Sequence, residues 1–334
     1  MIARSPQKAE SPAWVSELRA AYTQPAALLR FLELSPHTVD LDLRAAARFA
    51  FRVPQPYARR MRVGDAADPL LRQVLPIRDE LREVAGFTAD PVGDLGAQRH
   101  PGFLHKYHGR ALLLLSGACA INCRYCFRRE FPYQGAVGSP QLAAAVTAVA
   151  ADTQLNEVIL SGGDPLLMHD PQLAELLLQL SAIPHLRRLR IHTRLPLVLP
   201  SRVTADLLDS LGRSRLKPIL VLHVNHAQEI DQEVVTACAA LTKQGVTLLN
   251  QAVLLRGVND NAAVLTDLSE ALFEAGILPY YLHLLDPVRG AAHFSVDDAQ
   301  VRALQTQLQA RLAGYLVPRI VREVAGAPSK IPFY

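Results

Sequence analysis

The sequence predicts an α/β fold with a parallel sheet, on two observations. Short apolar runs recur from about residue 111 onward, and amphipathic helical stretches separate them. Strands that alternate with helices indicate parallel βα units, because a parallel crossover needs a long connection. The six apolar runs are Ala111–Leu115, Glu157–Leu160, Leu189–His192, Ile219–Val224, Val246–Leu255 and Ile277–Leu284.

The stretches between these runs have apolar residues at helical spacing. Examples are QLAAAVTAVAADT, PQLAELLLQLSAI, VTADLLDSLGRS, DQEVVTACAALTKQG and VLTDLSEALFEAG. Six βα units are fewer than the eight of a closed barrel. The pattern therefore leaves two architectures open, an incomplete open barrel and a doubly wound sheet.

The first hundred residues have a different hydrophobic pattern, which predicts a helical cap without alternating strands. Helical spacing is found in WVSELRAAY, TQPAALLRFLEL, AAARFAFRVP, PYARRMRVG and DPLLRQVLPI, before the turn-rich TADPVGDLG.

Composition excludes several classes of protein. Hydrophobic residues make up 50% and charged residues 20%, as in an ordinary globular chain. A net charge of +4 is too weak to indicate direct nucleic-acid binding. No apolar run is long enough for a spanning helix, and the N-terminus lacks the apolar core of a signal peptide. We expect a soluble cytoplasmic protein with no membrane partner.

Three of the four cysteines form a C-x3-C-x2-C triplet, Cys119, Cys123 and Cys126. Thiolates bind soft metals and iron–sulfur clusters, and three ligands on one loop can hold three irons of a four-iron cluster. The fourth iron would then keep an open position. A zinc site would need a further ligand from another loop. Cys238 lies on a predicted amphipathic helix, so we expect a buried, unreactive thiol.

Polar residues follow every apolar run. SGACAINCRYC follows the first, SGGD the second, and HTR, HVNH, NQ and HLLD accompany the others. Sites in parallel α/β folds form at the carboxyl ends of the strands, so these residues are candidates for one shared site.

Several motifs together resemble the lysine 2,3-aminomutases of the radical S-adenosylmethionine (SAM) superfamily. They are KYHGRALLLLSGACAINCRYCFRREFPY, LSGGDPL, LLNQAVLLRGVNDN, LPYYLHLLDPVRGAAHF and PSKIP. The closest resemblance is to the shorter bacterial form that acts with translation elongation factor P. The resemblance implies a partial (β/α)6 barrel over residues 106–315, after an N-terminal helical domain of residues 1–105. A C-terminal segment, 316–334, carries Lys330.

The resemblance also implies three cofactors and their ligands. Cys119, Cys123 and Cys126 would hold a [4Fe–4S] cluster whose open iron binds SAM. Lys330 would form a Schiff base with pyridoxal phosphate (PLP), with Arg110 on the phosphate and Tyr107 against the ring. The expected SAM-binding residues are Ser161, Gly162, Gly163, Asp164, Asn225, His226 and Gln251.

The expected reaction is conversion of L-lysine to (R)-β-lysine. Arg128 would bind the substrate carboxylate, while Asp286 and Glu323 would bind its side-chain ammonium. Glu323 stands where the family has an aspartate, which puts tight binding of lysine in question. The chain stops four residues after Lys330 and lacks the cysteine-bearing segment of the longer enzymes. We therefore expect no structural zinc.

The expected partners are a low-potential electron donor, such as flavodoxin or ferredoxin, and a functional link to elongation factor P and its lysyl ligase. Two alternatives remain. An iron–sulfur electron carrier or metal-stabilised binding protein would need the cysteines but not Lys330 or Asp286. A 2,3-aminomutase for glutamate would not need acidic residues at the side-chain end of its pocket. The sequence leaves the oligomeric state open, including a homo-oligomer.

Overall fold

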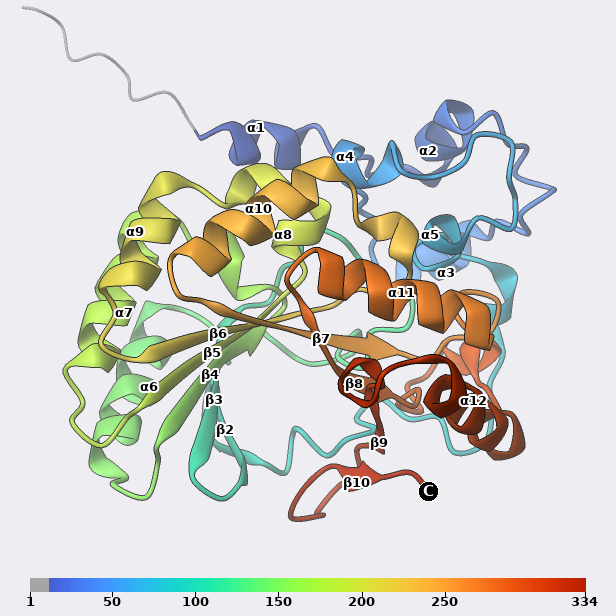
Figure 1. Cartoon of the computed structure of the whole chain (residues 1–334). Coiled ribbons are helices and arrows are strands. Elements are labelled where there is room, and N and C mark those ends of the chain that lie inside the picture. Colours follow the sequence, from blue (N-terminus) through green and yellow to red (C-terminus); the bar gives the residue numbers. More distant parts are fainter. Residues whose placement is uncertain (1–11) are drawn as a thin grey trace, which may run out of the picture.

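The computed structural model describes residues 12–334 and contains a ten-stranded sheet whose strands follow one another in chain order (Figure 1). Strands β3 to β9 are parallel, and the antiparallel strands β1, β2 and β10 extend the two edges. The strands are β1 Gln98–His100, β2 Phe103–Tyr107, β3 Arg110–Ser116, β4 Glu157–Gly162, β5 Arg188–Thr193, β6 Lys217–Leu222, β7 Thr247–Val253, β8 Leu278–His283, β9 Arg319–Arg322 and β10 Ile331–Pro332.

Helices connect each parallel strand to the next. The connecting helices are α6 Ser139–Ala151, α7 Asp170–Ser181, α8 Leu195–Val198, α9 Ala205–Arg213, α10 Gln232–Lys243, α11 Ala262–Glu274 and α12 Asp298–Arg311. A doubly wound sheet needs a point at which the strand order reverses, and this sheet has none in the described chain. The predicted α/β fold with a partial (β/α)6 barrel is therefore confirmed.

Alternation along the strands decides which side chains enter the barrel. On β5, Leu189 and Ile191 join the core beneath the helices, so Arg190 and His192 face the other side of the sheet. The same alternation on β6 and β7 directs His223 and Gln251 inward, since their neighbours Leu222 and Ala252 belong to that core. The barrel interior is consequently polar where the site forms.

The N-terminal part is helical but more broken than the sequence indicated. Prolines begin or precede most of its short helices, because a proline fits only the first turn. Its residues join the same hydrophobic cluster as the barrel strands, so they close one end of it. The helices are α1 Ala13–Arg19, α2 Pro25–Phe31, α3 Leu43–Arg48, α4 Gln55–Ala58 and α5 Pro69–Arg72.

Four further elements were not predicted. Strands β1 and β2 form a hairpin edge beside β3, with only three and five residues. Strand β9 has only two buried residues, Ile320 and Val321, and helix α12 has a mostly polar sequence. The apolar pattern of each element is too short, or contains too many polar residues, to distinguish the element from a loop.

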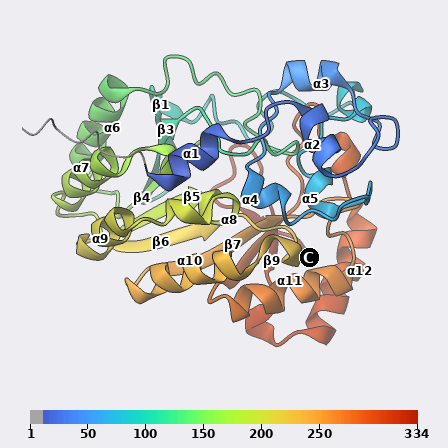
Figure 2. The ribbon, with the colours of Figure 1, turned by 90° about the horizontal axis from the view of Figure 1, so that it is seen from above.

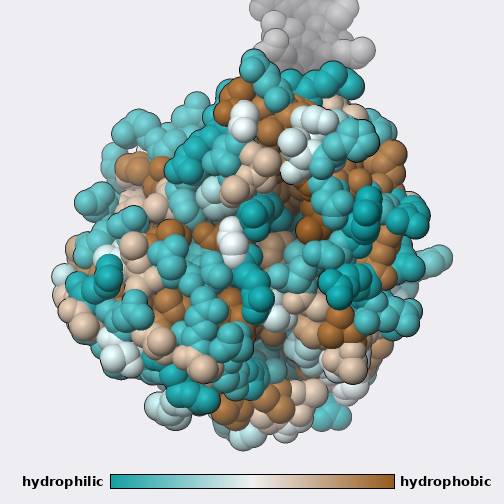
Figure 3. All heavy atoms as spheres, turned by 90° about the vertical axis from the view of Figure 1, so that its right-hand side faces the viewer, coloured by the Kyte–Doolittle hydropathy of each residue, from teal (hydrophilic) through white to brown (hydrophobic). Residues whose placement is uncertain are grey.

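The views from other sides agree with this arrangement. Helices α1 and α4 lie over the barrel near α8 (Figure 2). Hydrophobic residues are interspersed with hydrophilic ones on the face shown in Figure 3.

Within residues 12–334, no helix has both the length and the hydropathy to cross a membrane. Cys238 is fully buried on α10, as expected.

A buried ion pair at the start of α7 supports the contact of α1 with the barrel. Arg202 is fully buried, pairs with Asp170 at 2.7 Å and stacks 4.9 Å from the ring of Trp14. It also donates to the carbonyls of Leu166 and Met168. Removing one partner of a buried pair leaves the other charge without compensation.

We therefore expect Arg202→Met to lower the free energy of unfolding by about 3–5 kcal/mol. The matched control is Arg213→Met, which breaks an exposed pair with Asp209 at 2.8 Å and should change it by less than about 1 kcal/mol. Urea unfolding followed by circular dichroism measures both. Equal losses in the two variants would contradict this account of the pair.

Candidate active site

The three clustered cysteines lie on the loop that follows β3, at the carboxyl end of the barrel. The Cys126 amide donates to the Cys123 carbonyl at 3.0 Å, which turns the loop back on itself. Burial and the neighbouring Cys123 raise the pKa of the Cys126 thiol to about 11. Burial, Cys126 and Asp164 raise the pKa of Cys119 well above its ordinary value. The three half-buried cysteines therefore share one environment.

This donor set fits an iron–sulfur cluster better than a single metal ion. In residues 12–334, no three cysteine, histidine or acidic side chains converge closely enough to hold one ion. Cysteines that each bind a different iron of a cluster need no such convergence. Bound iron would also supply the positive charge that the buried thiolates need.

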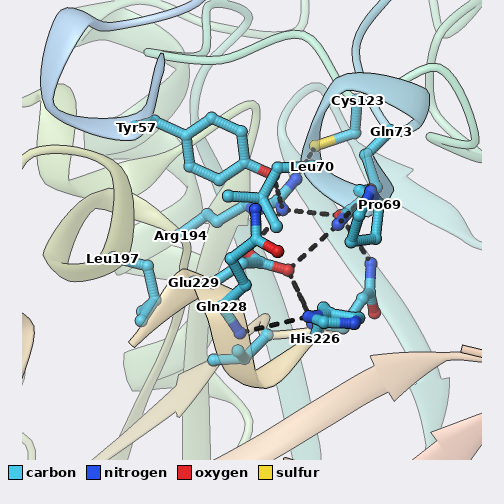
Figure 4. Close-up of polar contacts among 12 residues, drawn as sticks. Tyr57, Pro69, Leu70, Gln73, Cys123, Arg194, Leu197, His226, Gln228 and Glu229 are labelled. Atoms are coloured by element: carbon cyan, nitrogen blue, oxygen red, sulfur yellow. Dashed lines mark hydrogen bonds and ion pairs between the residues drawn. The ribbon is translucent and has the colours of Figure 1, made fainter. Parts of the chain in front are cut away.

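A buried polar network surrounds Cys123 (Figure 4). At its centre Arg194, just after β5, donates to Cys123 Sγ at 2.7 Å, Gln73 Oε1 at 2.7 Å and Glu229 Oε2 at 2.7 Å. The hydroxyls of Tyr57 and Tyr125 each lie 3.1 Å from the same guanidinium. The network joins the cysteine loop to the N-terminal helices and to the β6 end of the barrel.

The loop and the end of β4 approach each other closely at two glycines. A Cβ on Gly163 would lie 2.1 Å from the Ala118 carbonyl oxygen, and one on Gly162 would lie 2.4 Å from that of Ser116. Only glycine permits this approach. The Gly163 amide donates to Ser116 at 2.6 Å, so the backbone itself places the cysteines.

Asp164 anchors this junction. Its carboxylate accepts hydrogen bonds from Thr193 Oγ1 at 2.8 Å, from the amide of Arg194 at 2.8 Å and from that of Leu166 at 3.0 Å. Burial raises its pKa to about 6. These contacts fix Asp164 at the end of β4, and its contact with SAM stays a prediction.

The other residues predicted to bind SAM lie around the same end of the barrel. The Asn225 amide donates to Tyr125 at 2.6 Å and to Gln73 at 3.0 Å, inside the network around Arg194. His226 caps a short helix, where its Nδ1 accepts from the Gln228 amide at 3.1 Å. Gln251 faces the barrel interior from β7. Their contacts with SAM stay predictions.

On the other side of the interior, charged side chains alternate in a line, which we call the ion chain: Lys330, Glu323, Lys106, Asp94 and Arg128. The Lys330 ammonium lies 2.6 Å from Glu323 Oε2, and Lys106 lies 3.0 Å from Glu323 Oε1. Asp94 then bridges Lys106 and Arg128, each at 2.6 Å. Arg128 also donates to Ser161 Oγ at 3.0 Å.

The ion chain keeps its carboxylates ionised although they are buried. Burial opposes ionisation of Glu323, but Lys330 and Lys106 outweigh it and lower its pKa to about 2. Burial likewise opposes ionisation of Asp94, and Arg128 and Lys106 lower its pKa. The chain brings together Lys330, Glu323 and Arg128, which the sequence predicted. Asp94 and Lys106 were missed.

Asp286 lies beside this chain without a partner. Its Oδ1 is buried and makes no hydrogen bond. Burial and the nearby Glu323 carboxylate raise its pKa to about 7. Asp286 and Glu323 follow the adjacent strands β8 and β9, where the Leu284 amide donates to the Val321 carbonyl at 2.9 Å, but their surroundings differ. Both Glu323 oxygens contact the protein's own ammonium groups, whereas Asp286 has a free acceptor.

Tyr107 and Arg110 face each other across the β2–β3 turn, where they are register partners. The Arg110 guanidinium lies 5.1 Å from the centre of the Tyr107 ring. Burial, with Glu323 next, raises the pKa of the Tyr107 hydroxyl. These two residues thus border the Glu323 end of the ion chain.

Three histidines at strand ends complete the interior. The sequence placed them among the polar residues at the strand ends but assigned them no role. Burial is the first cause that lowers the pKa of His192, His223 and His283, and Lys330 contributes in each case. They are therefore neutral at neutral pH. The Nε2 atoms of His192 and His283 are buried and unpartnered. The signal was present, because the alternation of β5 and β6 directs His192 and His223 inward.

The unpartnered atoms of His192, His283 and Asp286 around Lys330 fit a polar ligand in the barrel. Comparisons with known proteins agree with this geometry. Residues 113–267 match the radical SAM superfamily. The L-lysine 2,3-aminomutase of Escherichia coli is 51% identical over 96% of this chain and 94% of the relative. This chain belongs to the lysine 2,3-aminomutase family of radical SAM enzymes.

Two further relatives with the same name support that membership. The protein of Haemophilus influenzae is 44% identical over 99% of this chain and 98% of its own length. That of Buchnera aphidicola is 46% identical with the same coverage, 99% and 98%. Lysine 2,3-aminomutases are isomerases, and radical SAM enzymes use a [4Fe–4S] cluster and SAM. The cysteine loop described above is the part of this chain that suits the cluster.

The close approach at Gly163 predicts that even one methyl group displaces the cysteine loop. We expect Gly163→Ala to lower the free energy of unfolding by about 1–3 kcal/mol. After anaerobic reconstitution it should also retain less iron than the wild type. Gly314→Ala is the control, because a Cβ there meets no atom within 4 Å. Full iron content and unchanged stability in Gly163→Ala would contradict this role.

Proposed function

We propose that this enzyme isomerises L-lysine to (R)-β-lysine with a [4Fe–4S] cluster, SAM and PLP. The observation that carries the proposal is Asp286, a buried carboxyl with a free oxygen beside Glu323. Burial disfavours the ionised form of this carboxyl, and a cation placed beside it would stabilise that form. The side-chain ammonium of lysine is that cation.

Different residues, at the two ends of the barrel, would hold the cluster and PLP. Cys119, Cys123 and Cys126 would hold three irons, and Arg194 would donate to the Cys123 thiolate. Lys330 would carry PLP, with Tyr107 and Arg110 beside it. When bound, these groups supply a substrate-derived radical and the means of moving an amino group between adjacent carbons.

The ion chain fits the two ends of the substrate. Arg128 lies at one end of it, where its remaining guanidinium hydrogens would bind the α-carboxylate. Asp286 lies near the other end, by Glu323 and Lys330. The neutral state of His192, His223 and His283 adds no positive charge beside the substrate ammonium. Acidic groups at the side-chain end favour lysine over glutamate.

We further propose that the β-lysine modifies translation elongation factor P, with cytoplasmic enzymes supplying electrons and attaching the product. The support for this link is the resemblance of the chain's motifs to the shorter bacterial form of the enzyme. Mass spectrometry of the factor from cells with and without this enzyme tests the link.

Turnover of lysine tests the proposal directly. Anaerobic protein reconstituted with iron, sulfide, PLP and SAM should form β-lysine from L-lysine. Replacing any cysteine of the triplet with alanine should abolish SAM cleavage, whereas Cys238→Ala should not. Borohydride should trap PLP on Lys330. An adduct on Lys106 or Lys217, or a preference for glutamate, would contradict the assignment.

Asp286 should determine how efficiently the enzyme turns over lysine. We expect Asp286→Asn to lower kcat/KM for lysine about a hundredfold, as for loss of a charge-assisted contact of about 3 kcal/mol. Iron and PLP content should be unchanged, because Asp286 contacts neither the cysteine loop nor the Tyr107–Arg110 pair in this structure. Normal turnover of lysine by this variant would rule out the proposed ammonium contact.

The raised pKa of Asp286 gives this contact a pH dependence. Only ionised Asp286 attracts the ammonium, and its pKa of about 7 means that it is mostly protonated below neutral pH. The ratio of kcat/KM between the wild type and Asp286→Asn should therefore rise about tenfold from pH 6 to pH 8. Taking the ratio cancels titrations that both proteins share. A ratio that does not change with pH would contradict the assignment.

A further inference from the structure

The two neighbouring carboxyl groups, Asp286 and Glu323, differ in the number of cations that they contact. Glu323 contacts two of the chain's own ammonium groups, Lys330 at 2.6 Å and Lys106 at 3.0 Å. Asp286 leaves a buried oxygen without any hydrogen bond. One of the two ammonium groups on Glu323 therefore stands close to the place proposed for the substrate ammonium.

Lys106 is a fixed part of the site. Its ammonium donates to Glu323 Oε1 at 3.0 Å and to the Val92 carbonyl at 2.8 Å, and it forms an ion pair with Asp94 at 2.6 Å, so three groups hold it in place. It lies on β2, within the sheet. We therefore expect Lys106 to keep these contacts when the substrate binds.

Lys330 is placed differently. Its hydrogen bond is to Glu323, and its ammonium lies 5.8 Å from the centre of the Tyr281 ring. The segment that leads to it from Glu323 is mostly exposed, so few contacts hold that segment in one place. Lys330 also has the same four-methylene ammonium side chain as the proposed substrate.

We propose that the Lys330 ammonium occupies the ammonium subsite at Glu323 and Asp286 until PLP takes its nitrogen, so that lysine binds there only afterwards. This inference rests on the proposed function and adds an order of binding to it.

Charge balance supports this order. Glu323 and Asp94 each contact two of the three cations Lys330, Lys106 and Arg128. A substrate ammonium at Glu323 would be a fourth cation beside these two carboxylates. Once Lys330 leaves Glu323 for PLP, Glu323 has lost one of its two cations, and the ammonium of lysine can take that place.

Calorimetry on the PLP-free protein tests the inference without turnover. We expect L-lysine to bind Lys330→Met at least ten times more tightly than it binds the PLP-free wild type. Lys330→Gln should behave in the same way, which guards against a folding defect in one variant. Lys217→Met is the matched control, because Lys217 is exposed at the start of β6. Its affinity should equal that of the wild type.

Two further measurements assign the gain to the subsite. Norleucine lacks the ammonium and should bind all these proteins equally. Adding Glu323→Gln to Lys330→Met should remove the gain. Equal affinity of the wild type and both Lys330 variants for L-lysine would overturn the inference, as would a gain that survives Glu323→Gln. Turnover of lysine by the loaded wild type decides the proposed function separately, so the two can fail independently.

Discussion

Lys106 and Asp94 form the centre of an alternating line of charges on which the proposed substrate pocket depends. The two residues contact each other, Lys106 also contacts Glu323, and Asp94 also contacts Arg128. Loss of Asp94 would leave the buried Arg128 without its carboxylate, at a cost of about 3–5 kcal/mol, whereas loss of Lys106 would leave Asp94 and Glu323 with one cation each. Because the line ends at Lys330 on one side and Arg128 on the other, it fixes the separation between the two ends of the pocket.

The cysteine loop depends on a second constraint, the backbone contact at Gly162 and Gly163. That contact places the loop directly above the end of β4, while the network around Arg194 holds Cys123 from the opposite side. Ser161, which precedes the glycines, accepts a hydrogen bond from Arg128. The end of β4 thus joins the cluster side of the barrel to the substrate side within three residues.

The sequence predicted the parts whose signal is local. The six strands appeared as apolar runs, and the cysteine triplet and Lys330 stood out by spacing and by resemblance. Strand β9 did not, because only Ile320 and Val321 are buried in it. The ion chain could not be predicted, because Lys106 and Glu323 are 217 residues apart and meet only when β2 and β9 join one sheet. The three protein donors to Asp164 could not be predicted either, because two of them, Thr193 and Arg194, come from the end of β5, about 30 residues further along the chain.

The coupling between Asp94 and Lys106 tests most directly whether the line of charges is a single unit. A double-mutant cycle with Asp94→Asn and Lys106→Met, measured by urea unfolding, isolates their interaction. The account predicts a coupling energy between about 1 and 3 kcal/mol, since either single variant removes the same direct contact, the 2.6 Å ion pair between Lys106 and Asp94. Additive losses, with a coupling below about 0.3 kcal/mol, would show that the charges act independently and would contradict the account.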